Sequence, residues 1–178
     1  MKTILAINGS ASENSSNHKL IANFAELSKD FFTVTAFKDL KSLPHFDPEL
    51  SINNTPALIV NFRKAIENAD GILICTPEYV FSIPSGLKNA IEWCVSTTVF
   101  SDKPTALITA SASGEKGHEE LQLLLKTLMA TFTAGTTLLI QGIKVKINQQ
   151  GEITDSKTKD SLANFVYSFK ILVEKENS

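Results

Sequence analysis

Three segments of this 178-residue chain place hydroxyl, amide or glycine residues directly after short apolar runs. The first follows the run at residues 3–7 and reads NGSASENSSN, with an amphipathic helix predicted after it. Backbone N–H groups at a helix start bind anions, and Ser and Asn side chains add donors without crowding a phosphate. This segment alone is equally consistent with an ordinary polar loop that ends in a helix N-cap.

The second segment, residues 76–82, follows an apolar run at 71–75 that does not alternate with polar residues. Such a run is typical of a strand buried on both faces of a parallel sheet. Pro77 has no N–H for the strand ladder and ends the strand, so the segment is predicted to be a loop at the strand's carboxyl end. Open α/β sheets bind ligands at this edge. The third segment, 111–117, follows another such run, and its glycines let the backbone approach a flat ligand closely.

The rest of the chain supplies the elements that would position these loops. Apolar runs alternate with segments whose apolar residues recur at helical spacing. The runs lie at residues 3–7, 32–37, 71–75, 105–110 and 138–140. This pattern predicts an α/β fold with a doubly wound, five-stranded parallel sheet between two helical layers. We expect the flavodoxin-like order 2-1-3-4-5, which puts strands 1 and 3 side by side at the switch point.

Size and composition indicate a single domain over residues 1–178, long enough to bury a hydrophobic core without disulfides or metal ions to stabilise it. Hydrophobic residues make up 43% and charged residues 20%, with a formal net charge of −2. A protein that binds nucleic acid or anionic membranes needs a concentrated basic face, so neither partner is expected. No apolar run reaches the ~18 residues of a membrane span, and we expect a cytoplasmic protein. Cys75 and Cys94 lie on apolar faces and are predicted to pack in the core.

Two stretches of the chain resemble the NADPH-dependent FMN reductases, the flavodoxin-like flavoenzymes that include quinone, azo and chromate reductases. One is T-P-E-Y at 76–79 followed by S-I-P-x-x-L-K-N-A-I-E-W at 82–93, and the other is G-S-x-x-x-x-S-x-N at 9–17. The second is similar to the family's FMN-phosphate loop. The resemblance implies an FMN-dependent oxidoreductase that passes electrons from NADPH or NADH to a small-molecule acceptor, and it implies a homodimer or homotetramer.

The resemblance also implies cofactor-binding residues in all three loops. Backbone groups of Glu78, Tyr79 and Val80 would contact the edge of the flavin ring. We assign no catalytic residue and no metal ligand, because hydride transfer is the chemistry of the flavin itself. The complete expected set is Gly9, Ser10, Ser12, Ser15, Ser16, Asn17, Pro77, Glu78, Tyr79, Val80, Phe81, Ser82, Ser111, Ser113 and Gly114.

Two departures from the family pattern leave some points open. Many members carry Asn where Val80 stands, and an arginine is usual where Ser12 stands. That arginine contributes to NADPH recognition in the family, so the preference between NADPH and NADH is open, as is the FMN affinity. The Tyr79 side chain is expected to stack on the ligand or line its pocket, the alternative being that it packs into the next helix.

Other functions fit the same fold. A flavodoxin-like electron carrier resembles T-x-T-G-x-T in its phosphate loop and surrounds its flavin with acidic residues, unlike this nearly neutral chain. A non-enzymatic relative that has lost tight FMN binding is the second alternative, suggested by Ser12 and Val80. For an enzyme, the acceptor is open among a quinone, an azo compound, a metal oxyanion and free flavin.

Four charged or aromatic positions outside the motifs have two interpretations each. His45 and Phe46 lie in a long predicted loop at 38–55, where they either cover a substrate or belong to a solvated loop. Lys116 and His118 either meet a nicotinamide phosphate or are exposed bystanders at a helix start. Arg63 is expected on the solvent side of a helix that begins near Pro56.

Overall fold

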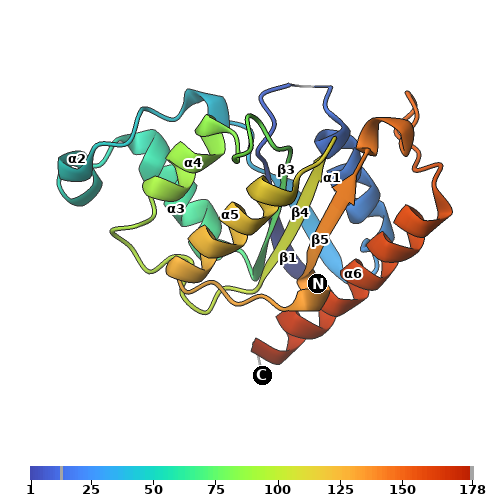
Figure 1. The fold of residues 1–178 in the computed structure, drawn as a ribbon. Coiled ribbons are helices and arrows are strands. Elements are labelled where there is room, and N and C mark those ends of the chain that lie inside the picture. The colour runs from blue at the N-terminus through green and yellow to red at the C-terminus, as the bar shows by residue number, and fades with distance from the viewer. Residues whose placement is uncertain (13, 177–178) are drawn as a thin grey trace.

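The computed structural model describes residues 1–12 and 14–176 (Figure 1). Within these residues, five parallel strands form one sheet in the order β2-β1-β3-β4-β5. The predicted α/β fold and strand order are therefore confirmed. The strands are β1 (Lys2–Asn8), β2 (Phe32–Ala36), β3 (Gly71–Thr76), β4 (Thr105–Ser111) and β5 (Thr137–Gln141).

Helices cover both faces of the sheet (Figure 1). On one face, α1 (Ser16–Leu27) and α6 (Ser156–Glu176) lie side by side. On the other face lie α3 (Ala57–Asn68), α4 (Ser85–Glu92) and α5 (Glu115–Thr127). The short α2 (Pro48–Ile52) stands at the outer side of this second layer. None of the helices in the described part of the chain has the length and hydropathy needed to cross a bilayer.

Each face of the sheet has its own hydrophobic core. The core under α1 and α6 contains a group of phenylalanine rings, in which Phe24 and Phe169 have centroids 6.2 Å apart. The core under α3, α4 and α5 is built around the fully buried Phe62 and Trp93. Strands β1, β3 and β4 contribute to both cores, which is why their sequences read as unbroken apolar runs. The edge strand β2 alternates instead.

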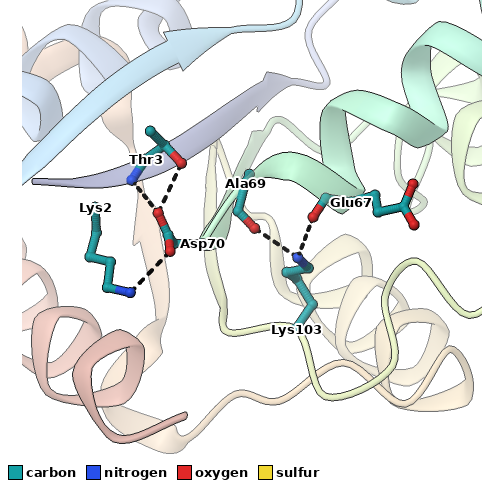
Figure 2. Close-up of polar contacts among 6 residues, drawn as sticks. All are labelled: Lys2, Thr3, Glu67, Ala69, Asp70 and Lys103. Carbon is teal, nitrogen blue, oxygen red and sulfur yellow. Dashed lines mark hydrogen bonds and ion pairs between the residues drawn. The ribbon is translucent and has the colours of Figure 1, made fainter. Parts of the chain in front are cut away.

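The amino-terminal end of the sheet, opposite the predicted loops, is fastened by Asp70 (Figure 2). Its carboxylate accepts hydrogen bonds from the Thr3 backbone N–H at 2.7 Å and from the Thr3 hydroxyl at 2.9 Å. It also pairs with the Lys2 ammonium at 3.1 Å. Burial works to raise the pKa of Asp70, but the bonds from Thr3 and Lys2 outweigh it and lower the pKa below its usual value. The contact ties β1 to the start of β3.

A second polar contact, made by Lys103, lies at the same end of the sheet and caps the carboxyl end of α3. The Lys103 ammonium donates hydrogen bonds to the carbonyl oxygens of Glu67 at 3.0 Å and of Ala69 at 2.7 Å (Figure 2). Carbonyl groups in the last turn of a helix have no helical partner, and a lysine there satisfies them. Partial burial lowers the pKa of Lys103.

Segment 38–55 is more ordered than the sequence predicts. It contains a 3-10 turn, η1 (Leu40–Ser42), and the helix α2. Asp47 caps α2 by accepting hydrogen bonds from the N–H groups of Glu49 and Leu50, and Pro48 occupies the first helical position. The prediction of one long loop over 38–55 is therefore wrong for these two elements, which are too short to show a hydrophobic period.

The expectation that Arg63 faces solvent is also wrong. Its guanidinium donates to the Trp93 carbonyl oxygen at the end of α4, with Nε at 2.9 Å. It also donates to the carbonyl oxygen of Ser51 in α2 and to the Ser96 hydroxyl. One side chain of α3 therefore joins α2 to the end of α4. A guanidinium with several fixed donors is suited to this role.

Candidate active site

A cavity of about 570 Å³ lies at the carboxyl edge of the sheet. Its lining comes from the loop between β1 and α1, the ends of β3 and β4, and the turn after β5. Since β3 and β4 lie between β1 and β5 in the sheet, their ends form the floor and the other two segments the walls. The lining residues are Ser10, Ser12, Asn14, Ser15, Ser16, Asn17, Pro77, Tyr79, Ala110, Ser111, Ala112, Gly142, Ile143, Lys144 and Val145.

The β1–α1 wall is organised by its own short side chains. The Asn8 side-chain oxygen accepts from the Ser10 N–H at 3.0 Å, and the Ser10 hydroxyl accepts from the Ser12 N–H at 3.2 Å. Ser15 caps α1, its hydroxyl accepting from the N–H of His18 at 3.1 Å. The N–H groups of Ser16 and Asn17 have no partner within the helix, because the first turn has no preceding carbonyls. The wall thus offers hydroxyls and backbone donors at a helix start.

Two predicted residues support this wall from below. The Asn17 side chain is buried, donating from its amide to the Ala110 carbonyl at 3.3 Å and accepting from the Cys75 thiol at 3.3 Å. Its amide therefore fixes the helix start over β3 and β4. Gly9 is also buried, and a Cβ there would collide with the Thr76 side chain and with Leu87. Gly9 thus allows the chain to leave β1 close to β3.

The segment after β3 forms a two-residue hairpin. The Tyr79 N–H donates to the Ser82 carbonyl at 2.8 Å, and the Ser82 N–H donates back at 3.1 Å. Val80 and Phe81 between them have positive φ values of 52° and 58°, as a type I′ turn requires. Tyr79 lines the cavity, with its hydroxyl 3.4 Å from the Ser10 hydroxyl oxygen. Val80 and Phe81 are 93% and 76% exposed.

Glu78 joins this hairpin to α5. Its two carboxylate oxygens accept from the N–H of Gly114 at 3.2 Å and from the N–H of Gly117 at 2.9 Å. Gly114 has a φ of 91° and begins the helix, so the left-handed conformation presents its N–H together with that of the first turn. A carboxylate at a helix N-terminus is also favoured by the helix dipole.

Glu120 holds the other end of the hairpin. Its carboxylate accepts from the Ser82 hydroxyl at 2.6 Å and from the Ile83 N–H at 2.9 Å, with the Lys88 ammonium 3.7 Å away. Burial works to raise the pKa of Glu120, but the Ser82 and Ile83 hydrogen bonds outweigh it and lower the pKa. Two carboxylates from different elements therefore fix the hairpin that carries Tyr79.

The cavity brings together about half of the residues expected to bind a cofactor. It includes Ser10, Ser12, Ser15, Ser16, Asn17, Pro77, Tyr79 and Ser111. The other expected residues are not in its lining, for the structural reasons given above or because they are exposed, and their assignment stays a prediction. These are Gly9, Glu78, Val80, Phe81, Ser82, Ser113 and Gly114.

The turn after β5 is the part of the lining that sequence reasoning missed. Gly142, with a φ of 61°, leads from β5 into a 3-10 turn, η3 (Ile143–Val145). The alternating residues 144–147 predict a short exposed extension, which is wrong because the chain forms a 3-10 turn here and Ile147 is buried. The rule that ligand loops follow the carboxyl ends of parallel strands would have identified this turn. Asn14, Ala110 and Ala112 were missed as well.

The remaining candidate residues do not enter the cavity. Phe46 packs edge-to-face on Trp93, with ring centroids 5.4 Å apart, while His45 is exposed. Lys116 pairs with Glu119 on the surface of α5. His45 and Lys116 are therefore exposed residues outside the cavity, whereas Phe46 fits neither interpretation, because it packs against the core instead of lying in a solvated loop.

Burial shifts the pKa of His118 and of both cysteines. The His118 Nδ1 lies 2.9 Å from the Thr109 hydroxyl, and partial burial lowers the pKa of the imidazole. Cys75 and Cys94 are both buried, as predicted, and burial raises the pKa of Cys94 to about 12. Burial disfavours the thiolate of both cysteines, and the thiolate is the reactive form of the side chain. Among the described residues, no group of His, Cys, Asp and Glu side chains is arranged to hold a metal ion.

The chain is similar to proteins of known activity over nearly its whole length. It is 30% identical to an NAD(P)H:quinone oxidoreductase of Solanum tuberosum, over 94% of this chain and 90% of that one. It is 28% identical to a quinone reductase of Escherichia coli (strain K12), over 97% and 95%. Its fold matches the solved structure of FerB, a flavoenzyme NAD(P)H:(acceptor) oxidoreductase from Paracoccus denitrificans, with a TM-score of 0.87, 27% identity and 99% coverage of both chains.

The family model described as NADPH-dependent FMN reductase matches residues 2–143, which include the β1–α1 loop, the hairpin and the start of the β5 turn. The resemblance seen in the sequence motifs is therefore confirmed. The chain belongs to the NADPH-dependent FMN reductase family and is an NAD(P)H-dependent oxidoreductase, with FMN and NADH or NADPH as the cofactors that this membership implies.

Proposed function

We propose that this protein binds FMN in the cavity at the carboxyl edge of the sheet and uses it to transfer electrons from NADH or NADPH to a quinone. The observation that carries the proposal is the composition of that cavity. It joins a helix start rich in neutral hydrogen-bond donors to an aromatic residue, Tyr79, across the ends of β3 and β4. Phosphate and a flat ring are the two ends of FMN.

The residues present fit that ligand in size and in chemistry. Small-molecule sites have volumes of about 300–1,000 Å³, and this cavity has about 570 Å³. The hydroxyls of Ser10, Ser12 and Ser15 and the first N–H groups of α1 would hold the phosphate. Pro77, Tyr79 and the backbone after β4 would hold the ring. Asn17, although in the lining, would contribute through its backbone because its side chain is already bonded.

The chain's own contribution to the reaction is position. When bound, FMN supplies hydride acceptance and release through its own ring chemistry. The described lining of the cavity includes no Asp, Glu or His, and we assign no acid–base side chain, because hydride transfer would be the chemistry of the flavin itself. The hairpin clamped by Glu78 and Glu120 would keep Tyr79 and Pro77 in fixed positions against the ring. Fixed geometry is what places two reactants for hydride transfer.

The names of the relatives favour a quinone as the acceptor. Besides the plant and Escherichia coli proteins, a 2-hydroxy-1,4-benzoquinone reductase of Burkholderia sp is 29% identical over 92% of this chain and 91% of its own. We therefore put a quinone ahead of an azo compound, a metal oxyanion or free flavin.

Steady-state kinetics test this function. Purified protein supplied with FMN should oxidise NADH or NADPH in the presence of a benzoquinone, and the flavin absorbance should bleach under anaerobic NADPH and return when quinone is added. A protein that binds FMN but shows no turnover with either nicotinamide cofactor would instead be an electron carrier. A protein that takes up no FMN would be the non-enzymatic alternative.

Assembly and location remain predictions. Resemblance to the family implies a homodimer or homotetramer, and light scattering on the purified protein would determine which. We also expect the protein in the cytoplasm, and fractionation of cells that express it would test this.

A further inference from the structure

Lys144 differs by its charge from every other described residue that lines the cavity. Among the described residues that line the cavity, it alone carries a formal charge, and the others are hydroxyl, amide, apolar or glycine residues. Lys144 lies in η3, the turn after β5, on the wall opposite the β1–α1 loop. Lys144 is exposed to solvent and belongs to the lining of the cavity.

The sheet places this turn next to the start of α1. Ala110 of β4 pairs with Ile140 of β5, only four residues before Lys144. The Ala110 carbonyl also accepts the hydrogen bond from the Asn17 side chain, which sets the first turn of α1 over the end of β4. The helix start and the β5 turn therefore both border the end of β4, although Asn17 and Lys144 are 127 positions apart in the sequence.

The wall that carries Lys144 is held in place by several contacts. The Gly142 N–H donates to the Ala112 carbonyl at 3.1 Å, and the Ile143 side chain is buried. Four residues after Lys144, the chain is also bonded to α1, because the Lys19 ammonium donates to the Asn148 carbonyl at 2.9 Å. The position of Lys144 relative to the first turn of α1 is thus set by the fold on both sides.

We propose that Lys144 binds the phosphate of FMN and supplies the positive charge of an anion site whose other donors, on the β1–α1 loop, are neutral. This inference rests on the proposed function, since it concerns the same cavity. A phosphate monoester carries a charge of about −1.5 to −2 at neutral pH. Neutral hydroxyl and N–H donors can satisfy its oxygens but do not balance that charge, and a lysine acts on phosphate as a point charge.

Riboflavin makes the proposal testable, because it has the same ring and chain as FMN but no phosphate. We would measure Kd for both flavins by fluorescence quenching with the wild-type protein, K144A, K144R and K146A. Lys146 is the matched control, since it lies two residues away and is not in the lining. K144A should weaken FMN binding about tenfold, as expected for loss of one charge-assisted contact, and change riboflavin binding less than twofold.

The other variants and the salt dependence sharpen the result. K144R should retain most of the FMN affinity, and K146A should bind both flavins like the wild type. Added salt should weaken FMN binding by the wild type more than by K144A, because salt screens the pair of Lys144 and phosphate, which K144A lacks. Circular dichroism would confirm that each variant is folded.

The outcomes separate this inference from the proposed function. Equal weakening of FMN and riboflavin by K144A would overturn the assignment to the phosphate, and so would unchanged binding of both. In either case a wild-type protein that binds FMN would leave the proposed function standing. A wild-type protein that binds neither flavin would overturn both.

Discussion

The carboxylate of Glu78, just after β3, accepts a hydrogen bond of 2.9 Å from the backbone N–H of Gly117 in the first turn of α5. The loop after one central strand is thereby fastened to the helix that follows the next strand. A residue expected to touch a flavin through its backbone thus has a side chain committed to the fold.

Removal of the Glu78 side chain should destabilise the protein. Glu78→Ala takes the acceptor away from the N–H groups of Gly114 and Gly117, which should lower the free energy of unfolding by about 1–3 kcal/mol. Glu78→Gln keeps one side-chain oxygen and should lose less. Urea denaturation of the two variants would measure both effects. An alanine variant as stable as the wild type would show that the contact with α5 contributes nothing.

Asparagine at position 80 should stabilise the protein. Val80 has a φ of 52°, a conformation that is costly for a β-branched residue and better tolerated by Asn. Val80→Asn should raise the free energy of unfolding by about 1 kcal/mol. Val95→Asn is the control, because Val95 is also exposed but is not among the described residues with positive φ. If both substitutions had the same effect on the melting temperature, strain at Val80 would not be the cause.

The contact of Asp70 with Thr3 and Lys2 should make the free energy of unfolding decrease as pH falls into the acid range. Because the pKa of Asp70 is lower in the folded than in the unfolded chain, the unfolded state takes up the proton first as pH falls. The stabilisation is present above the unfolded pKa of about 4 and is lost as pH falls through the folded value. Asp70→Asn should cost about 1 kcal/mol at pH 7 and much less at pH 2. A pH-independent difference between the two proteins would contradict this.

The Tyr79 ring, rather than its hydroxyl, should matter for flavin binding. The hydroxyl lies a long 3.4 Å from Ser10, so Tyr79→Phe should bind FMN like the wild type. Tyr79→Ala removes the aromatic surface and should raise Kd about two- to tenfold. Tyr167→Ala, on the exposed side of α6, is the matched control. An alanine variant with unchanged Kd would place Tyr79 outside the binding site.

The sheet could be predicted from the sequence because its strands are buried on both faces. Gly71–Thr76 and Thr105–Ser111 are apolar without alternation, and the switch point follows from the strand order they imply. The β1–α1 loop and Tyr79 follow from the same rule, since they stand at the carboxyl ends of those strands.

Contacts between distant segments could not be predicted in this way. Two of the partners of Arg63, Ser51 and Trp93, lie 12 and 30 residues away in the chain, and no local hydrophobic period predicts these contacts. Glu120 is one of several polar residues on α5, and only the folded chain shows that it holds Ser82. The alternation around Lys144 predicts an exposed extension, and only the folded chain shows that its turn lines the same cavity as the start of α1.

The structure of the protein crystallised with FMN is the most direct test of the central claim. Flavin should lie in the cavity between the β1–α1 loop and the β5 turn, with its phosphate at the start of α1 near Ser15 and its ring beside Tyr79. Flavin bound elsewhere on the molecule, or an empty cavity at saturating FMN, would contradict the claim.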